Sequence, residues 1–176
     1  MFSTSLRWIF IVCVLIDNMK FDEFKEKYII LQKKHSLPNF DEMNSAFDIG
    51  KLKRDSGNLI RDIRRTMVEK IVYYLKLSEL ILNPSQASSI FMVLLKEVTT
   101  EDKKIVDSII SSFVDLELKA HKLDISSTEK DESDLIIKLF NSWNEKKQDL
   151  VSIIEILERN WKQAKNPLKK NKDYFN

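Results

Sequence analysis

The sequence is poor in the residues that end helices and form tight turns. Its 176 residues include only two glycines, Gly50 and Gly57, and three prolines, Pro38, Pro84 and Pro167. Folds rich in β-strands need many turns, and turns use glycine and proline. The phosphate-binding loops of nucleotide-binding proteins need several closely spaced glycines. This scarcity favours an all-α fold and excludes both the P-loop and the glycine-rich loop of dinucleotide-binding folds.

The chain also lacks the residue groups that build metal and catalytic sites. Its single cysteine, Cys13, excludes an intramolecular disulfide, and no Cys/His cluster offers zinc ligands. Glu117 and His121 are four residues apart on one predicted helix, but a di-metal bundle repeats such pairs, so a surface ion pair is the favoured interpretation. His35 is interpreted as a charge that complements a helix C-terminus. We expect a non-enzymatic, cytoplasmic protein without a cofactor.

Positive and negative charges nearly cancel. The chain has 29 lysines and arginines and 27 aspartates and glutamates, a formal net charge of +2. A partner attracted by charge would therefore have to recognise a local patch rather than the whole molecule.

Residues 1–18 contain an apolar run from Trp8 to Ile16. Nine residues are too few to span a bilayer, and the run is not followed by the small residues of a signal-peptide cleavage site. Three interpretations stay open: an overextended start with translation beginning at Met19, a short anchor for a membrane or partner, and a core helix.

Apolar residues return every three or four positions through most of the chain, which predicts a series of amphipathic helices. Asn39 and Glu42 resemble a capping box, Asn83-Pro84 a helix junction, and Thr99 or Thr100 a further cap. A final helix is expected to begin near Thr128 or Ser133. The other expected helices cover residues 21–35, 40–50, 51–83, 85–98 and 100–123.

Two segments carry more specific expectations. Residues 85–98 are apolar almost all round, which predicts the buried central helix of a bundle. Residues 124–134 are the most polar stretch, which predicts a solvated loop. They lack the ligand order and turn glycine of a calcium-binding loop, so calcium binding is not expected.

The final helix carries the most regular apolar pattern, a heptad-like seam interrupted only by Lys147. Its tryptophans fit either the core or a partner surface, so the sequence predicts a protein-interaction seam without choosing between them. The seam consists of Ile136, Phe140, Trp143, Lys147, Leu150, Ile154, Leu157 and Trp161. Its candidate contact residues are Trp143, Leu150, Leu157 and Trp161.

A basic stripe marks the expected helix 51–83. Lys51, Arg54, Asn58, Arg61 and Arg65 step by three or four residues, which predicts one helix face able to contact phosphate or an acidic partner. No aromatic residues interleave with the arginines, so stacking on bases is not expected. An ordinary solvated face is the alternative interpretation.

Two resemblances to known proteins follow from short segments. Residues 37–44, LPNFDEMN, together with Asn83-Pro84, resemble archaeal all-helical proteins that have no assigned activity. Residues 58–65, NLIRDIRR, with EKI at 69–71 and TTED at 99–102, are similar to the helical domain of GINS replication-complex subunits. The second resemblance implies a replication role, but no segment here has the alternation of the small β domain that GINS subunits also carry.

The sequence thus predicts a single-domain, all-α bundle of about five to six helices with a long C-terminal helix. The expected organisation is an N-terminal extension over 1–18, a helical domain over 19–165 and a basic, solvated tail over 166–176. The expected function is a scaffold or adaptor that binds a protein partner or a second copy. The alternatives are a nucleic-acid accessory protein and a domain tethered to a membrane through residues 1–18.

Overall fold

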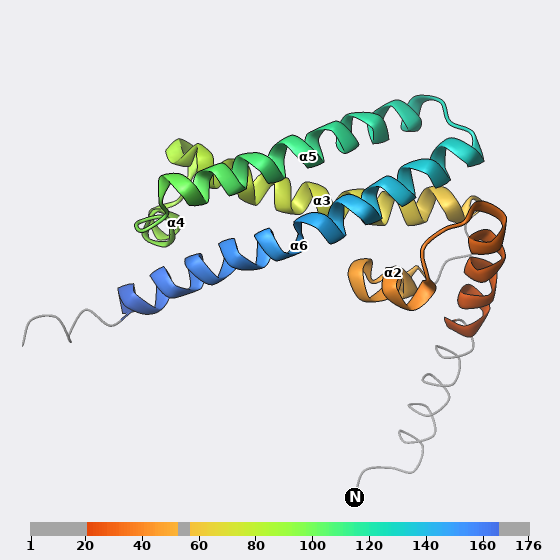
Figure 1. The fold of residues 1–176 in the computed structure, drawn as a ribbon, viewed down its shortest axis with the longest axis horizontal. Coiled ribbons are helices and arrows are strands. Elements are labelled where there is room, and N and C mark those ends of the chain that lie inside the picture. The colour runs from red at the N-terminus through yellow and green to blue at the C-terminus, as the bar shows by residue number, and fades with distance from the viewer. Residues whose placement is uncertain (1–20, 53–56, 166–176) are drawn as a thin grey trace, which may run out of the picture. The chain divides into compact units, whose positions relative to one another are not determined.

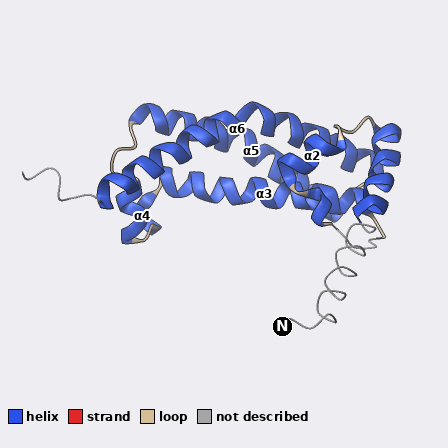
Figure 2. Cartoon of the chain, turned by 90° about the horizontal axis from the view of Figure 1, so that it is seen from below, coloured by secondary structure: helices blue, strands red, loops and turns tan. Residues whose placement is uncertain are grey.

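The computed structural model describes residues 21–52 and 57–165, and all regular secondary structure within them is helical (Figures 1 and 2). The all-α prediction and the long C-terminal helix are confirmed. The expectations for residues 1–18, for Arg54 and for the tail over 166–176 lie outside the described residues. No helix in the described part is long and apolar enough to cross a membrane.

The elements follow one another with short connections. A first helix covers residues 21–35. The remaining elements are α2 (Phe40–Phe47), the 3₁₀ helix η1 (Ile49–Lys51), α3 (Leu59–Leu82), the 3₁₀ helix η2 (Pro84–Gln86), α4 (Ser89–Leu94), α5 (Thr100–Ile125) and α6 (Glu129–Lys165).

Contacts divide the chain into two compact units. The described part of unit 1 comprises residues 21–52, 57–68 and 120–140, and that of unit 2 comprises residues 69–119 and 141–165. Helices α3, α5 and α6 each contribute residues to both units.

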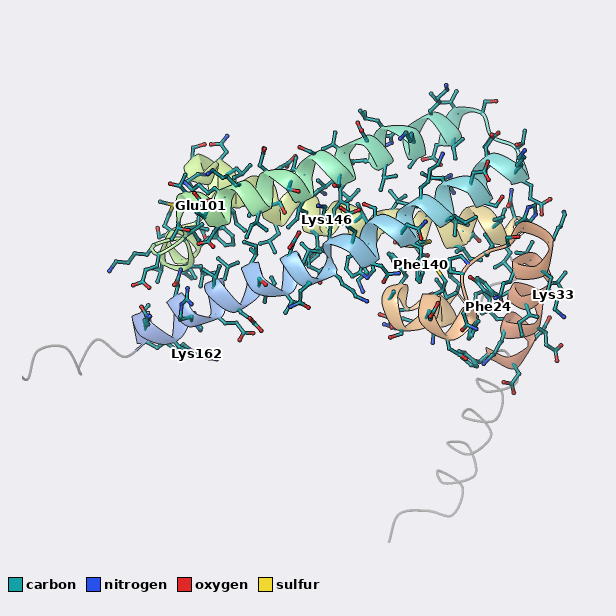
Figure 3. The ribbon with its side chains drawn as sticks, viewed as in Figure 1. Phe24, Lys33, Glu101, Phe140, Lys146 and Lys162 are labelled. Atoms are coloured by element: carbon teal, nitrogen blue, oxygen red, sulfur yellow. The ribbon has the colours of Figure 1, made fainter. Side chains whose placement is uncertain are left out.

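The first helix and α2 pack through aromatic rings in unit 1. Phe40 lies 5.7 Å from Phe21, 6.0 Å from Phe24 and 5.4 Å from Tyr28, measured between ring centroids. Figure 3 shows Phe24 between these two helices. The Tyr28 hydroxyl donates to the carbonyl of Pro38 at 2.8 Å, and burial raises the pKa of this tyrosine. This cluster holds the two short helices together.

Three of the predicted helix starts are confirmed by their caps. The Asn39 side chain accepts a hydrogen bond from the amide of Asp41 and begins α2. Thr99 and Thr128 each exchange hydrogen bonds with an aspartate three residues on, Asp102 and Asp131, and so begin α5 and α6. These side chains satisfy amide groups that the helix itself leaves without partners.

Three predicted boundaries are wrong. α3 begins at Leu59 rather than Lys51, because Lys51 belongs to η1 and Asn58 caps the helix. The helix expected over 85–98 is only α4, begun by Ser88. The loop expected over 124–134 contains the end of α5 and the first turns of α6, because acidic residues favour a helix N-terminus.

The predicted central helix is also wrong in position. α4 has no buried residue, and Ile90 and Met92 are 65% and 48% exposed. The core of unit 2 instead lies among α3, α5 and α6, where Ile81, Val106 and Ile153 are buried together. α4 packs against this core through Phe91 and Leu94, so its other side, with Ile90 and Met92, stays in solvent.

Gly50 occupies a crowded turn after α2. Its amide donates to the Asn44 side chain at 2.7 Å, and a Cβ at Gly50 would stand 2.6 Å from the Phe21 ring and 2.8 Å from the Asn44 oxygen. A Cβ at Gly57 would have no atom within 4 Å. The two glycines of the chain therefore differ in what they contribute.

We expect Gly50→Ala to lower the free energy of unfolding by about 1–3 kcal/mol, because the ring and the amide must both move. Gly57→Ala is the matched control and should change it by less than about 0.5 kcal/mol. Urea unfolding followed by circular dichroism measures both. Equal effects of the two substitutions would contradict the close packing at Gly50.

Candidate functional site

A buried arginine lies in unit 1. Arg64 of α3 is 1% exposed. Its Nε donates to the carboxylate of Glu132, which is equally buried, and its Nη2 donates to Asp124 at 2.7 Å. A guanidinium removed from water requires carboxylate partners, and here two are supplied, one by α5 and one by α6.

A second layer of polar groups completes this arrangement. Arg61 Nε donates to Glu132 at 3.2 Å and its Nη2 donates to the Ser127 hydroxyl at 2.9 Å. Ser127 in turn donates to Glu132 at 2.7 Å. Arg65 Nη2 donates to Asp124 at 3.2 Å. We call these six residues the arginine cluster: Arg61, Arg64, Arg65, Asp124, Ser127 and Glu132.

The arginine cluster was missed from the sequence, although a signal for it exists. Arg64 falls in register with the buried residues Ile60 and Met67, so it occupies a core position of α3. Glu132 likewise lies one helical turn before the buried Ile136. A charged residue in the register of an apolar face, on two different helices, is the pattern that predicts a buried pair.

A smaller ionic contact joins the first helix to the start of α6. The Lys34 ammonium donates to Glu129 at 2.9 Å, and His35 Nε2 lies 2.8 Å from the same carboxylate. Its Nδ1 lies 3.4 Å from the Ser133 hydroxyl. The hydrogen bond from Lys34 and, to a smaller extent, the one with His35 hold the pKa of Glu129 below its ordinary value. His35 therefore has a specific partner as well as a place at the end of its helix.

The residues of the predicted basic stripe do not form one helix face. Lys51 lies on η1 and pairs with Asp48 at 3.2 Å. Asn58 caps α3 through the amide of Arg61. The side chains of Arg61 and Arg65 are engaged in the arginine cluster, and Arg54 lies outside the described residues. The one-helix-face prediction is wrong because the helix starts too late to include Lys51.

Unit 2 contains an apolar groove between α4 and α6. It has a volume of about 280 Å³, and its walls are apolar except for one glutamate. The Asn160 amide fixes these walls by donating to the carbonyl of Leu94 at 2.6 Å. We call this site the α4–α6 groove; its lining residues are Ile90, Leu94, Ile154, Leu157, Glu158 and Trp161.

The two tryptophans of the predicted seam have different surroundings. Trp143 is 8% exposed, with the Tyr74 ring 5.5 Å away and the Lys70 ammonium 4.9 Å from its own ring. Trp161 is 37% exposed and lines the groove, with Lys165 4.7 Å from its ring. Leu150 and Leu157 are buried. Of these four seam residues, Trp161 alone is exposed.

No three His, Cys, Asp or Glu side chains come together as a metal site within the described residues. Glu117 and His121 both lie on α5, four residues apart as the sequence shows. Every carboxylate of the arginine cluster already accepts from arginine. The charged groups of the arginine cluster are bonded to one another and stabilise the fold, whereas the α4–α6 groove is open to solvent.

Comparison of the sequence with protein-family models and curated proteins, and of the fold with solved structures, finds no match.

Removing the buried guanidinium should destabilise the fold. We expect Arg64→Met to lower the free energy of unfolding by about 3 kcal/mol, because it leaves the buried Glu132 without this guanidinium. The loss is not larger because Arg61 and Ser127 still donate to Glu132. The double variant Arg64→Met with Glu132→Leu should recover part of this loss, because no buried carboxylate remains. Chemical unfolding measures both. The control Arg65→Met, an exposed arginine, should cost less than about 1 kcal/mol; a cost equal to that of Arg64→Met would contradict the assignment.

The Asp124 carboxylate should make stability depend on pH. Its hydrogen bond from Arg64, with that from Arg65, holds its pKa below the ordinary 3.8. A pKa lowered by folding stabilises the fold above the unfolded value and loses this effect as pH falls through the folded value. The free energy difference between wild type and Asp124→Asn should thus shrink below about pH 4. Urea titrations at neutral and acidic pH measure it; a constant difference would refute the linkage.

Proposed function

We propose that this protein is a non-enzymatic helical adaptor that binds an apolar helix of a protein partner in the α4–α6 groove. The observation that carries the proposal is the exposed apolar surface of this groove. Ile90 of α4 and Trp161 of α6, which both line it, are 65% and 37% exposed. Contiguous exposed apolar surface on a folded protein marks an interaction site.

The shape and composition of the groove support a helical ligand. α4 and α6 form its two walls, and four aliphatic side chains and one tryptophan line it. An amphipathic helix fits such a groove with residues spaced three and four apart, and a tryptophan in the wall is typical of residues that dominate binding energy. Glu158 is the one charged lining residue. A basic residue beside the apolar stripe of the ligand would complement it.

The walls are held in place without a ligand. The Asn160 bond to Leu94 joins α6 to the end of α4. The Gln163 amide nitrogen, when it faces Glu97, lies within 3.1 Å of both oxygens of this carboxylate. A binding surface that is already ordered loses less conformational entropy on association, which favours affinity.

The arginines offer less support for nucleic-acid binding. Arg61 and Arg65 donate to Ser127, Glu132 and Asp124, so a phosphate would have to displace bonds already made within the chain. The adaptor function needs no such displacement, because the α4–α6 groove is open.

Photo-crosslinking tests the groove directly. We expect a benzoylphenylalanine placed at Ile90 to form a protein adduct in living cells, whereas the same group at Leu118 should not. Leu118 is the matched control, an apolar residue of α5 that is equally exposed at 62% against 65%. Trp161→Ala should lower the yield at position 90 by about fivefold or more while the far-ultraviolet spectrum stays unchanged. Absence of any adduct at position 90 would refute the adaptor function.

A further inference from the structure

α6 carries a second stripe beside its buried one in unit 2. Residues 147, 151, 154, 158, 161 and 165 alternate in steps of four and three, the spacing of a heptad seam. At roughly 100° per residue this stripe lies about a quarter of a turn from the buried Leu157. We call it the outer seam; its members are Lys147, Val151, Ile154, Glu158, Trp161 and Lys165.

The outer seam is apolar at its middle and exposed. Val151 is 46% exposed, Ile154 is half-buried, and Lys147 and Glu158 lie in solvent at either side of them. Three members, Ile154, Glu158 and Trp161, also line the α4–α6 groove. A helix bound along the outer seam would therefore lie in the groove as well.

The charges of the outer seam are complementary to the same seam reversed. Two identical helices that cross antiparallel about a two-fold axis pair residues whose numbers have a constant sum. With the axis between residues 152 and 153, Val151 faces Ile154 of the other copy and Lys147 faces Glu158. Symmetry repeats each contact, which gives four apolar side chains between two ion pairs. The basic residue that Glu158 calls for is thus present on this chain.

From this complementarity we propose that the occupant of the α4–α6 groove is a second copy of the chain, its α6 antiparallel along the outer seam. This proposal rests on the proposed function and identifies its partner. Lys147 and Glu158 at present make only exposed contacts, a bond to Asn144 and a 3.6 Å pair with Lys162. Both can exchange these contacts for the partner at little cost.

The size of the contact predicts a weak dimer. With this axis, the members of the outer seam that face each other run from residue 147 to 158, about 17 Å of helix, so a strip about 10 Å wide covers roughly 170 Å² of each copy. Stable interfaces bury about 800 Å² on each partner. We therefore expect a dimer that forms at tens of micromolar or above and dissociates on dilution.

Charge reversal at the two ends of the outer seam tests the arrangement. Sedimentation velocity up to about 200 µM should show a concentration-dependent dimer of the full chain. Lys147→Glu or Glu158→Lys alone places like charges opposite each other twice and should raise the dissociation constant at least about tenfold. The double variant should restore dimerisation. An equimolar mixture of the two single variants should also dimerise, because all four opposed charges are then complementary.

Matched controls lie elsewhere on the surface of α6. Glu145→Lys and Arg159→Glu reverse the same kinds of exposed charge outside the outer seam and should leave the dissociation constant unchanged. A wild-type chain that stays monomeric at about 200 µM would overturn the proposal. A dimer that ignores the single reversals, or one that the double variant fails to restore, would overturn it too.

The crosslink at position 90 separates this proposal from the proposed function. An adduct of twice the chain mass of 20.8 kDa supports the second copy as occupant. An adduct of any other mass, with a monomeric chain in sedimentation, overturns the second copy and leaves the adaptor function standing. No adduct at all overturns the adaptor function itself.

Discussion

The buried guanidinium of Arg64 is the constraint on which unit 1 depends. A charge removed from water is tolerated only when carboxylates meet it at hydrogen-bonding distance. Asp124 and Glu132 provide those carboxylates from either side of the turn that joins α5 to α6. A shift of α3 by one residue would rotate Arg64 away from both partners. The ionic contacts thus fix the register of three helices, which apolar packing alone specifies less sharply.

Local signals in the sequence identify most of the helices. The caps Asn39, Thr99 and Thr128 work through atoms two or three residues away, so they can be identified without knowledge of the fold. The position of α4 depends instead on how much apolar surface other helices already supply. Ile90 and Met92 look like core residues in sequence and are exposed because α3, α5 and α6 form the core without them. No local pattern contains that information.

The same limit applies to the candidate site. The heptad pattern of α6 predicts an apolar seam, and Leu150 and Leu157 are buried as core residues of that seam. Whether a tryptophan on the seam is covered depends on the neighbouring helix. For Trp143 this helix is α3, which contributes Tyr74, and for Trp161 it is the short α4. Lys147 interrupts the apolar pattern of the predicted seam but fits the spacing of the outer seam. One helix can carry two overlapping seams, and periodicity alone does not tell them apart.

The division of the chain into two units has a consequence for how the protein folds. In its described part, unit 1 combines residues 21–52 and 57–68 with residues 120–140, so its assembly waits for the intervening segment to be synthesised and its ends brought together. Neither unit corresponds to one continuous stretch of polypeptide, and the boundaries fall inside α3, α5 and α6 rather than in linkers. If one unit unfolded, α3, α5 and α6 would each end at the boundary of the other unit, with unpaired backbone groups there. Amide exchange throughout these three helices should consequently report a shared opening event rather than two separate ones.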